Sequence, residues 1–299
     1  MFTRVAIIGL GLIGGSIGLA LRRSGAASEV VGYDLGKGVS DNARRIGAIE
    51  QAYTALPDAV RGADLVVLAT PVGAMHALLQ DLAPALTPGT VVTDVASTKR
   101  QVLAWAEKFL PSSVAFVGGH PMAGKELSGV EAADPDLFCG RVYCLTPTAQ
   151  TNPAALEMVT TMIRALGARV RFLDPAEHDK QVACISHLPF LASTALVQTV
   201  ANSPAWGEMA LLASSGFRDV TRLAAGNSQM YRDICLTNGE AIVQCLDDYI
   251  ETLQTLRSMV AAGDRTIENV FVEAQQERLR WQASHDQAEP NCGGNGKKS

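Results

Sequence analysis

The chain has 299 residues, of which 47% are hydrophobic and 18% charged, and it carries a formal net charge of −5. This length allows two domains with a sizeable core, and the mild acidity gives no reason to expect nucleic acid or an anionic membrane surface as a partner. The N-terminus does not resemble a signal peptide, and every long apolar run is broken by charges or glycines, so the sequence predicts a cytoplasmic protein without a membrane span.

The first 173 residues alternate short apolar runs with helical patterns. Strands are predicted at Val5–Ile8, Val30–Tyr33, Leu65–Ala69, Val91–Thr93, Ala115–Val117, Val142–Leu145 and Arg169–Phe172. Helices are predicted between most of them, near 13–24, 41–47, 73–83, 98–109 and 154–166. This alternation is typical of an α/β fold, in which helices cover both faces of a largely parallel, doubly wound sheet.

A glycine fingerprint, GLGLIGGS, lies at residues 9–16 between the first predicted strand and the first predicted helix. Gly9 would allow the tight turn, Gly11 would let the backbone approach a pyrophosphate, and Gly14 would permit close packing of helix on strand. We therefore expect residues 1–173 to form a Rossmann-type domain that binds a dinucleotide.

Further residues refine the expected cofactor site. The helix start, around Leu12 and Ile13, would offer free N–H groups and a positive dipole end to the phosphates. Asp34 ends the second strand, where a carboxylate accepts hydrogen bonds from ribose hydroxyls and repels a 2′-phosphate, so NAD is favoured over NADP. Thr70 and Pro71 end a buried strand whose loop is expected to line the cofactor. Three nearby cations could still accommodate the phosphate of NADP: Lys37, Arg44 and Arg45.

The pattern of apolar residues changes after Asp174. Apolar residues recur at helical spacing through 179–201, 206–214, 229–260 and 265–283, which predicts an all-helical second domain over 174–285. The apolar residues of 230–260 would suit a dimer interface as well as an internal core. The polar, glycine-rich end, 286–299, is expected to be disordered. The six cysteines have no CxxC pair and no zinc-like spacing, so reduced thiols and no metal site are predicted.

Four segments carry polar residues that packing does not explain. They are DVASTK (94–99), GGHPMAGKELSGVEAA (118–133), SHLP (186–189) and GFRDVTRLAAGN (216–227). The first ends a predicted strand, and the second holds His120 between a glycine pair and a proline, which predicts a rigid loop. The third interrupts a helical run, and the fourth places Arg218 and Arg222 among apolar residues. With the glycine fingerprint, these segments outline a site for hydride transfer.

In this order the four segments resemble the motifs of the prephenate/arogenate dehydrogenases, the cyclohexadienyl dehydrogenases of tyrosine biosynthesis. The resemblance covers residues 3 to about 260, and the combination is far more specific than the glycine fingerprint alone. It implies a Rossmann-type domain followed by a helical, dimer-forming domain. It also implies NAD-dependent oxidative decarboxylation of prephenate to 4-hydroxyphenylpyruvate, with arogenate dehydrogenase or an enzyme of dual specificity as the alternative.

The resemblance also implies roles for individual residues. His120 matches the family's proton acceptor, a task that suits imidazole because its pKa lies near neutral pH. Ser97 matches the serine that hydrogen-bonds the reacting hydroxyl and orients the histidine and nicotinamide. Arg222 matches the arginine that holds a substrate carboxylate, with Arg218 as the near alternative. His187 matches a second histidine that lines the substrate pocket.

Structural roles remain open for several of these side chains. Ser97 could be the N-cap of the following helix. Arg222 could form a structural ion pair with Asp219 or Asp233. A further histidine, His178, is expected to fix the start of the helix that joins the two domains.

The sequence departs from the family pattern at two positions. Lys125 stands where many members have Ser or Thr, and Phe190 stands where many have a second histidine. A lysine near the side-chain end of the substrate would attract the pyruvyl carboxylate of prephenate, and it would favour arogenate less because that side chain carries an ammonium. Lys125 could equally be a solvated loop residue.

Two other functions fit part of this sequence. β-Hydroxyacid dehydrogenases share this architecture, but they typically use a catalytic lysine in the helical domain, and none occurs here between Lys180 and the tail. A non-catalytic NAD-binding regulator would keep the glycines and Asp34 without needing the four motifs together.

Overall fold

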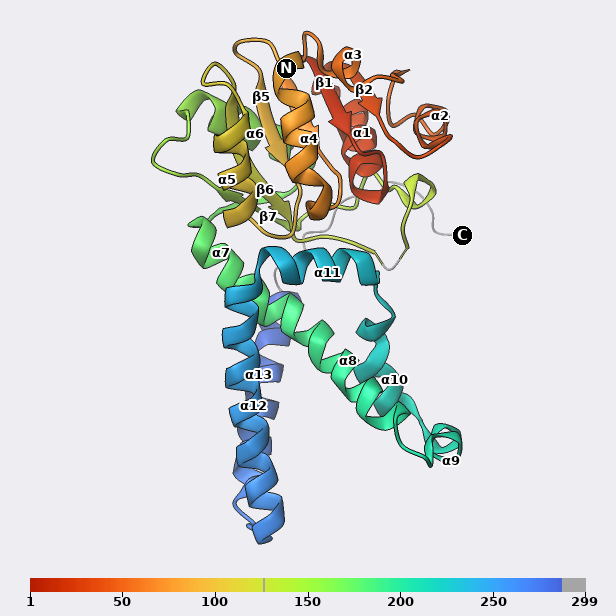
Figure 1. Ribbon diagram of the computed structural model, residues 1–299, viewed down its shortest axis with the longest axis vertical. Helices are drawn as coiled ribbons and strands as arrows, with labels where there is room; N and C mark the ends of the chain where they lie inside the picture. Colours follow the sequence, from red (N-terminus) through yellow and green to blue (C-terminus); the bar gives the residue numbers. More distant parts are fainter. Residues whose placement is uncertain (126, 287–299) are drawn as a thin grey trace.

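The computed structural model describes residues 1–125 and 127–286, and an eight-stranded sheet dominates its N-terminal half (Figure 1). The strands are β1 (Phe2–Ile8), β2 (Ala27–Tyr33), β3 (Gln51–Ala52), β4 (Leu65–Leu68), β5 (Val91–Asp94), β6 (Ala115–Pro121), β7 (Val142–Thr146) and β8 (Arg169–Phe172). Their order is β3-β2-β1-β4-β5-β6-β7-β8, and every neighbouring pair is parallel except β6 and β7. The predicted doubly wound, mostly parallel sheet is confirmed.

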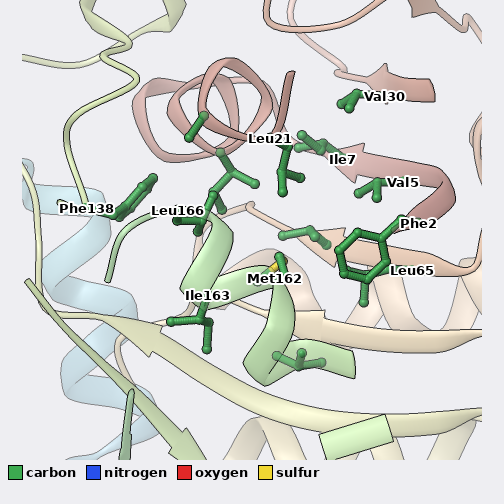
Figure 2. Packing of buried hydrophobic residues seen from close by; sticks show 14 of the residues in the cluster. Phe2, Val5, Ile7, Leu21, Val30, Leu65, Phe138, Met162, Ile163 and Leu166 are labelled. Carbon is green, nitrogen blue, oxygen red and sulfur yellow. The ribbon is translucent and has the colours of Figure 1, made fainter. Parts of the chain in front are cut away.

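Helices cover both faces of the sheet because side chains alternate along each strand. Val5 and Ile7 of β1 face one core, whereas Ala6 and Ile8 face the other. Figure 2 shows the first core, whose buried side chains include Leu21, Met162 and Ile163. This core is covered by α1 (Leu12–Ser24), α2 (Val39–Arg45) and α6 (Pro153–Ala165). The second is covered by α3 (Leu56–Val60), α4 (Met75–Leu82) and α5 (Arg100–Phe109).

The C-terminal half is helical, as predicted, and extends away from the sheet (Figure 1). Its elements are α7 (Pro175–Val182), the π-helical turn η4 (Ala183–His187), α8 (Leu188–Ala201), α9 (Trp206–Leu212), α10 (Ser215–Thr221), the short turn η5 (Arg222–Ala225), α11 (Ser228–Thr237), α12 (Gly239–Ala262) and α13 (Ile267–Asp286). The helical stretch predicted over 229–260 consists of two helices, because the chain bends at Asn238 between α11 and α12. Of the tail expected at 286–299, residues 287–299 lie outside the described residues.

The helical half has little core of its own among the described residues. Its cluster of buried apolar side chains consists of Ala183, Ile234, Ile242 and Cys245. The continuous helix Pro175–Ala201 is long and apolar enough to cross a membrane by length and composition, and 22% of its apolar window is buried in the single chain. The expectation that charges or glycines interrupt every long apolar run therefore fails for residues 181–201. Apolar side chains also remain exposed on α12 and α13, among them Val243, Ile250 and Phe271.

The cysteines differ from the prediction of reduced thiols. Cys184 and Cys245 form a disulfide that joins η4 to α12, although 61 residues separate them in the sequence. Spacing patterns detect only pairs that lie close in sequence, whereas this pair is brought together by the packing of two helices. Cys144 and Cys235 carry free thiols, as predicted.

Candidate active site

The turn between β1 and α1 requires its glycines. Gly9 has a φ of 94°, and a Cβ atom there would lie 2.6 Å from the carbonyl oxygen of Ala69. A Cβ atom on Gly14 would overlap the carbonyl oxygen of Gly9, whereas one on Gly11 would meet nothing within 4 Å. Gly9 and Gly14 therefore allow the backbone to pack closely, and Gly11 leaves an open cradle beside the turn.

The start of α1 faces this cradle without a side chain of its own. Gly11 is the N-cap residue, no side chain caps it, and the first turn contains no acidic residue. The first intrahelical bond joins the N–H of Gly15 to the carbonyl oxygen of Gly11, so Leu12 and Ile13 have no N–H partner within the helix. Unsatisfied N–H groups and the positive helix end together fit an anionic group such as a pyrophosphate.

Asp34 lies directly after β2, beside the same turn. Its Oδ2 atom accepts a hydrogen bond from the backbone N–H of Leu10 at 2.7 Å, and its Oδ1 atom accepts one from Gly36 at 2.7 Å. These bonds orient the carboxylate and leave further lone pairs for ligand hydroxyls. Thr70 and Pro71 follow β4, the neighbour of β1, where the strand order reverses and α/β sheets bind ligands. The residues present therefore fit a dinucleotide.

His120 lies on strand β6 and not in the rigid loop that the sequence predicts. It is paired with Cys144 in the antiparallel register of β6 and β7. The adjacent glycine makes this strand possible, since a Cβ atom on Gly119 would lie 2.7 Å from the carbonyl oxygen of Asp94. The carboxyl ends of β1, β4, β5 and β6 meet at one edge of the sheet, which brings His120 to the same edge as the glycine turn.

A hydrogen-bonded chain leads from His120 into the protein. Its Nδ1 atom lies 3.0 Å from Nε2 of His178, and Nδ1 of His178 lies 2.9 Å from Oδ1 of Asp179. His178 is fully buried. The start of α7 is instead capped by Asp174, whose side chain accepts hydrogen bonds from two backbone N–H groups. The role expected for His178, fixing that helix start, is therefore wrong.

Asp179, and not Ser97, binds the free backbone N–H groups at the beginning of α5. The carboxylate of Asp179 accepts hydrogen bonds from the backbone N–H groups of Lys99 at 2.7 Å and Arg100 at 2.9 Å, at the beginning of α5. The N-cap position of α5 is Lys99. Ser97 is half-buried and precedes this cap, so its alternative role as the N-cap is wrong.

A buried ion pair supports the strand that carries His120. The Nζ atom of Lys99 donates to Oδ2 of Asp94 and, at 2.6 Å, to the carbonyl oxygen of Gly119, and both charged side chains are fully buried. Desolvation lowers the pKa of Lys99, which the negative charge of Asp94 opposes. Sequence reasoning passed over Lys99. The sequence signal for this ion pair was the presence of two opposite charges, Asp94 and Lys99, in a motif that begins within a buried strand.

His187 closes the π-helical turn η4, which is a common place for functional residues. It is 1% exposed, and its Nδ1 atom lies 3.4 Å from Nδ2 of Asn238. The same amide group donates to the backbone carbonyl oxygen of Asp179 at 2.8 Å, so the surroundings of His187 and His178 are joined through Asp179. Desolvation lowers the pKa of His187 to about 4, against the opposing charge of Asp179.

His120 is held as a neutral base by its surroundings. Desolvation lowers its pKa well below the ordinary histidine value, and the neighbouring His178, Lys99 and His187 lower it further. His120 as a whole residue is nevertheless only half-buried. At neutral pH its imidazole is therefore unprotonated and able to accept a proton.

The two arginines, Arg218 and Arg222, lie in the helical half of the chain, far in sequence from the residues at the sheet edge. Arg222 begins η5, which is fixed to α8 by a hydrogen bond from the N–H of Ala224 to Oγ of Ser193 at 3.0 Å. Arg218 is exposed and forms an ion pair with Asp219 at 3.2 Å. Phe190, the second departure from the family pattern, is buried and stacks on Tyr231 with ring centroids 3.4 Å apart.

Lys125 follows β6 and is already paired. Its Nζ atom lies 2.7 Å from Oδ2 of Asp134, and both side chains are about one-third exposed, at 37% and 35%. The backbone N–H of Asp134 donates to Oγ of Ser16 in α1, which holds this ion pair over the nucleotide-binding helix.

Comparison with known proteins adds to this geometry. A family model described as prephenate dehydrogenase, nucleotide-binding domain, matches residues 17–172, and one described as prephenate dehydrogenase, dimerization domain, matches residues 174–276. The chain is 36% identical to a prephenate dehydrogenase of Bacillus subtilis over 269 residues, which cover 89% of this chain and 72% of that protein. It is 34% identical to a cyclohexadienyl dehydrogenase of Zymomonas mobilis over 290 residues, which cover 96% of this chain and 98% of that protein.

A solved structure is similar over both halves of the chain. The crystal structure of prephenate dehydrogenase from A. aeolicus, in complex with hydroxyphenyl propionate and NAD+, matches with a TM-score of 0.87 at 31% identity. The match covers 94% of this chain and 98% of that chain. Sheet and helical half are thus similar to those of a protein that holds a nicotinamide cofactor and a ring-bearing carboxylate.

Proposed function

The chain belongs to the prephenate dehydrogenase family, and we propose from this premise that it converts prephenate and NAD to 4-hydroxyphenylpyruvate, CO2 and NADH. The observation that carries this proposal within the chain is His120, a neutral base at the same sheet edge as the dinucleotide cradle. An oxidation that removes a hydride and a hydroxyl proton needs these two features side by side.

The cofactor is held by the turn after β1. The N–H groups around Leu12 and Ile13 would bind the pyrophosphate, with Gly11 allowing its approach, and Asp34 would accept the ribose hydroxyls. The loop of Thr70 and Pro71 would lie against the cofactor from the β4 side. When bound, NAD supplies the acceptor for the hydride that leaves C4 of the substrate.

His120 moves the proton. As C4 is oxidised, the 4-hydroxyl proton passes to the imidazole and the C–O bond becomes a carbonyl. The bond between the ring and its carboxylate then breaks, and its electron pair makes the ring an aromatic phenolate while CO2 departs. His120 returns the proton to the phenolate oxygen, so the base is regenerated and no proton is consumed overall.

Other side chains bind and orient the substrate in this proposal. Ser97, free of any capping role, hydrogen-bonds the reacting hydroxyl. His187 lines the pocket from η4. Arg222 binds a substrate carboxylate as a planar, permanently charged partner, with Arg218 as the alternative on the preceding helix. The ordered contact of η5 with α8 supports this placement of Arg222.

Lys125 bears on the choice between prephenate and arogenate. We propose that its ammonium group attracts the pyruvyl carboxylate of prephenate in exchange for part of its contact with Asp134. Exposed ion pairs of this kind contribute only about 0–1 kcal/mol, so Lys125 can change partners at little expense. The side chain of arogenate also carries a carboxylate, but its ammonium would be repelled by Lys125, so prephenate is the preferred substrate, with arogenate as the alternative.

Steady-state kinetics test the proposed function. Purified protein is mixed with NAD and either prephenate or arogenate, and the absorbance of reduced nicotinamide is followed together with release of CO2. We expect turnover of prephenate with NAD, a higher kcat/KM for prephenate than for arogenate, and a lower kcat/KM with NADP because Asp34 repels its 2′-phosphate. The absence of NADH formation with both substrates would contradict the proposed function, and a preference for arogenate would contradict the role of Lys125.

The enzyme is a homodimer, built through the helical half that matches the family's dimerization domain. Association would cover the apolar side chains left exposed on α8, α12 and α13. Its relatives are biosynthetic enzymes, and we propose that it works in the cytoplasm, where prephenate and NAD would both be available. Fractionation of the native cells, followed by the NADH assay on each fraction, tests this location.

A further inference from the structure

We propose that His178 and Asp179 form a hydrogen-bonded relay with His120 that fixes His120 in the tautomer needed for catalysis. This inference rests on the proposed function for its catalytic meaning. Its structural content, the position of one proton on His120, can be observed without any turnover.

The relay begins at Asp179, which acts only as an acceptor. Its carboxylate receives hydrogen bonds from the backbone N–H groups of Lys99 and Arg100, and an ionised carboxylate has no proton to donate. The contact between Oδ1 of Asp179 and Nδ1 of His178, at 2.9 Å, therefore requires a proton on Nδ1 of His178. Neutral His178 must then carry a lone pair on Nε2.

That lone pair decides the proton position on His120. Nε2 of His178 lies 3.0 Å from Nδ1 of His120, so Nδ1 of His120 must carry the proton and donate it. The second nitrogen of His120, Nε2, is then the unprotonated one. A base that receives a hydroxyl proton needs this free lone pair, and an inward-facing Nδ1–H leaves it on the opposite side of the ring.

The groups around the relay do not supply another fixed partner for Nδ1 of His120. Lys99 is occupied by Asp94 and the carbonyl oxygen of Gly119. His187, which also faces this region, has its Nδ1 atom toward Asn238. Cys144 lies opposite His120 in the sheet register, with a thiol whose pKa is raised by desolvation and which therefore stays neutral. Among the described residues, the relay is the contact that sets the tautomer.

The relay also explains why three separate elements meet at this point. Asp179 on α7 binds the beginning of α5, and His178 beside it binds His120 on β6. The two residues lie in the helical half of the chain, whereas the base lies in the sheet. His178 is thus a positioning residue that connects the base to the helical half.

The proton positions can be read by NMR of nitrogen-15-labelled histidine. The chain has five histidines, and His120→Asn identifies the signals of His120. In the unmodified enzyme we expect the Nδ1–H pattern for His120 and for His178. In His178→Phe, which keeps the ring but removes both nitrogens, we expect His120 to lose the pure Nδ1–H pattern. Asp179 is left intact because it also caps α5.

Kinetics supply the second readout. We expect His178→Phe to lower kcat by about 10–100-fold, the loss typical of removing a partner that orients a functional histidine, while the KM values for prephenate and NAD change less than about twofold. His178→Gln restores an acceptor at the reach of Nε2 and should recover part of kcat. His76→Gln, a histidine outside the relay, is the matched control and should retain kcat.

The outcomes separate the relay from the proposed function. An Nε2–H pattern for His120 in the unmodified enzyme, or full kcat in His178→Phe, overturns the relay even when prephenate is turned over. Equal losses in the Phe and Gln variants also overturn it, because an acceptor restored opposite Nδ1 of His120 would then have no effect on kcat. Nδ1–H on His120 in an enzyme that does not oxidise prephenate would leave the relay in place and overturn the function.

Discussion

In the proposed reaction, His120 is the side chain on which the chemistry depends. Replacing it with Asn keeps a polar group of similar reach but removes the base, so we expect NAD binding and most substrate affinity to remain while kcat falls by about 10²–10⁴-fold. Because the pKa of His120 is lowered, the acid limb of the unmodified enzyme should lie below the ordinary histidine range. The pH dependence of kcat measures both effects. A variant within about threefold of the unmodified enzyme would assign the base to another group.

Buried neutral histidines make the fold sensitive to acid. An unfolded histidine has a pKa of about 6.5, whereas that of folded His187 is lowered to about 4. Between these values the unfolded chain binds more protons, so the stabilisation is complete above about pH 6.5 and is lost as the pH falls toward 4.

The expected slope is about 1.4 kcal/mol per pH unit for each such histidine. Urea unfolding at several pH values between 4 and 7 measures it, and His187→Asn should show a shallower slope than the unmodified chain. His76→Gln is the control for removing a histidine outside this network. Identical slopes for His187→Asn and the unmodified chain would contradict the burial of a neutral His187.

At the scale of residues, sequence reasoning found the groups that stand in motifs, whereas it passed over Lys99 and gave His178 a role that the structure does not support. The glycine turn, Asp34 and His120 can be recognised from their local sequence spacing, and the structure places them at one sheet edge. His178 reaches His120, and Lys99 reaches the backbone of the neighbouring Gly119, only through the packing of α7 and α5 against the sheet. A single sequence without contacts carries no measure of such distances.

At the scale of elements, the stacked pair Phe190 and Tyr231 supports the turn that carries Arg222. A Cβ atom on Gly226, directly after η5, would lie 3.0 Å from Tyr231 and 3.3 Å from Phe190. Aromatic stacking contributes about 0.5–1.5 kcal/mol beyond burial. Tyr231→Leu should therefore raise the KM for prephenate by about 2- to 12-fold with a smaller change in kcat, because Arg222 loses its support.

The matched control for this variant is Tyr53→Leu, in the sheet half, where the hydroxyl group contacts Arg4 instead. Its KM for prephenate should remain that of the unmodified enzyme. A fall in kcat at unchanged KM in Tyr231→Leu would show that the pair acts on the chemical step and not on substrate binding.

Helices and strands were predictable where a periodic hydrophobic pattern extends over many residues. They were not predictable where tertiary contacts determine the secondary structure. The parallel strands read as continuous apolar runs, but β3 has only two residues and α3 only five, too few for a period. The extension of β6 through His120 depends on antiparallel pairing with β7, which the sequence around Gly119 and Pro121 does not reveal. No pattern in the sequence predicted the π-helical turn η4 before α8 either.

At the scale of the whole molecule, the dimer should depend on the apolar face of α12. Val243 and Ile250 lie seven residues apart on this helix and are 56% and 47% exposed in the single chain. We expect light scattering to give about twice the chain mass of 31.6 kDa. Val243→Glu would place a charge in the interface and should lower the measured mass toward that of one chain.

Arg164→Glu, which adds an acid on the exposed side of α6 in the sheet half, is the control and should leave the mass unchanged. A dimer that survives Val243→Glu would place the interface on other helices. The sequence predicted association from the excess of apolar residues over 230–260, but it could not say which of them face the partner, because the bend at Asn238 resets the helical phase.

The uneven distribution of core between the two halves bears on how the chain matures during synthesis. The buried residues of both large apolar clusters end at Ala168, and Val170 packs against the first of them, whereas the buried residues of the small cluster in the helical half run from Ala183 to Cys245. Domains fold as they leave the ribosome, N-terminal first. The nascent sheet can therefore close while the helices are still being translated. The helices reach their final burial only after two finished chains associate. The last step of maturation is therefore bimolecular, and its rate falls when the chain is expressed at a lower concentration.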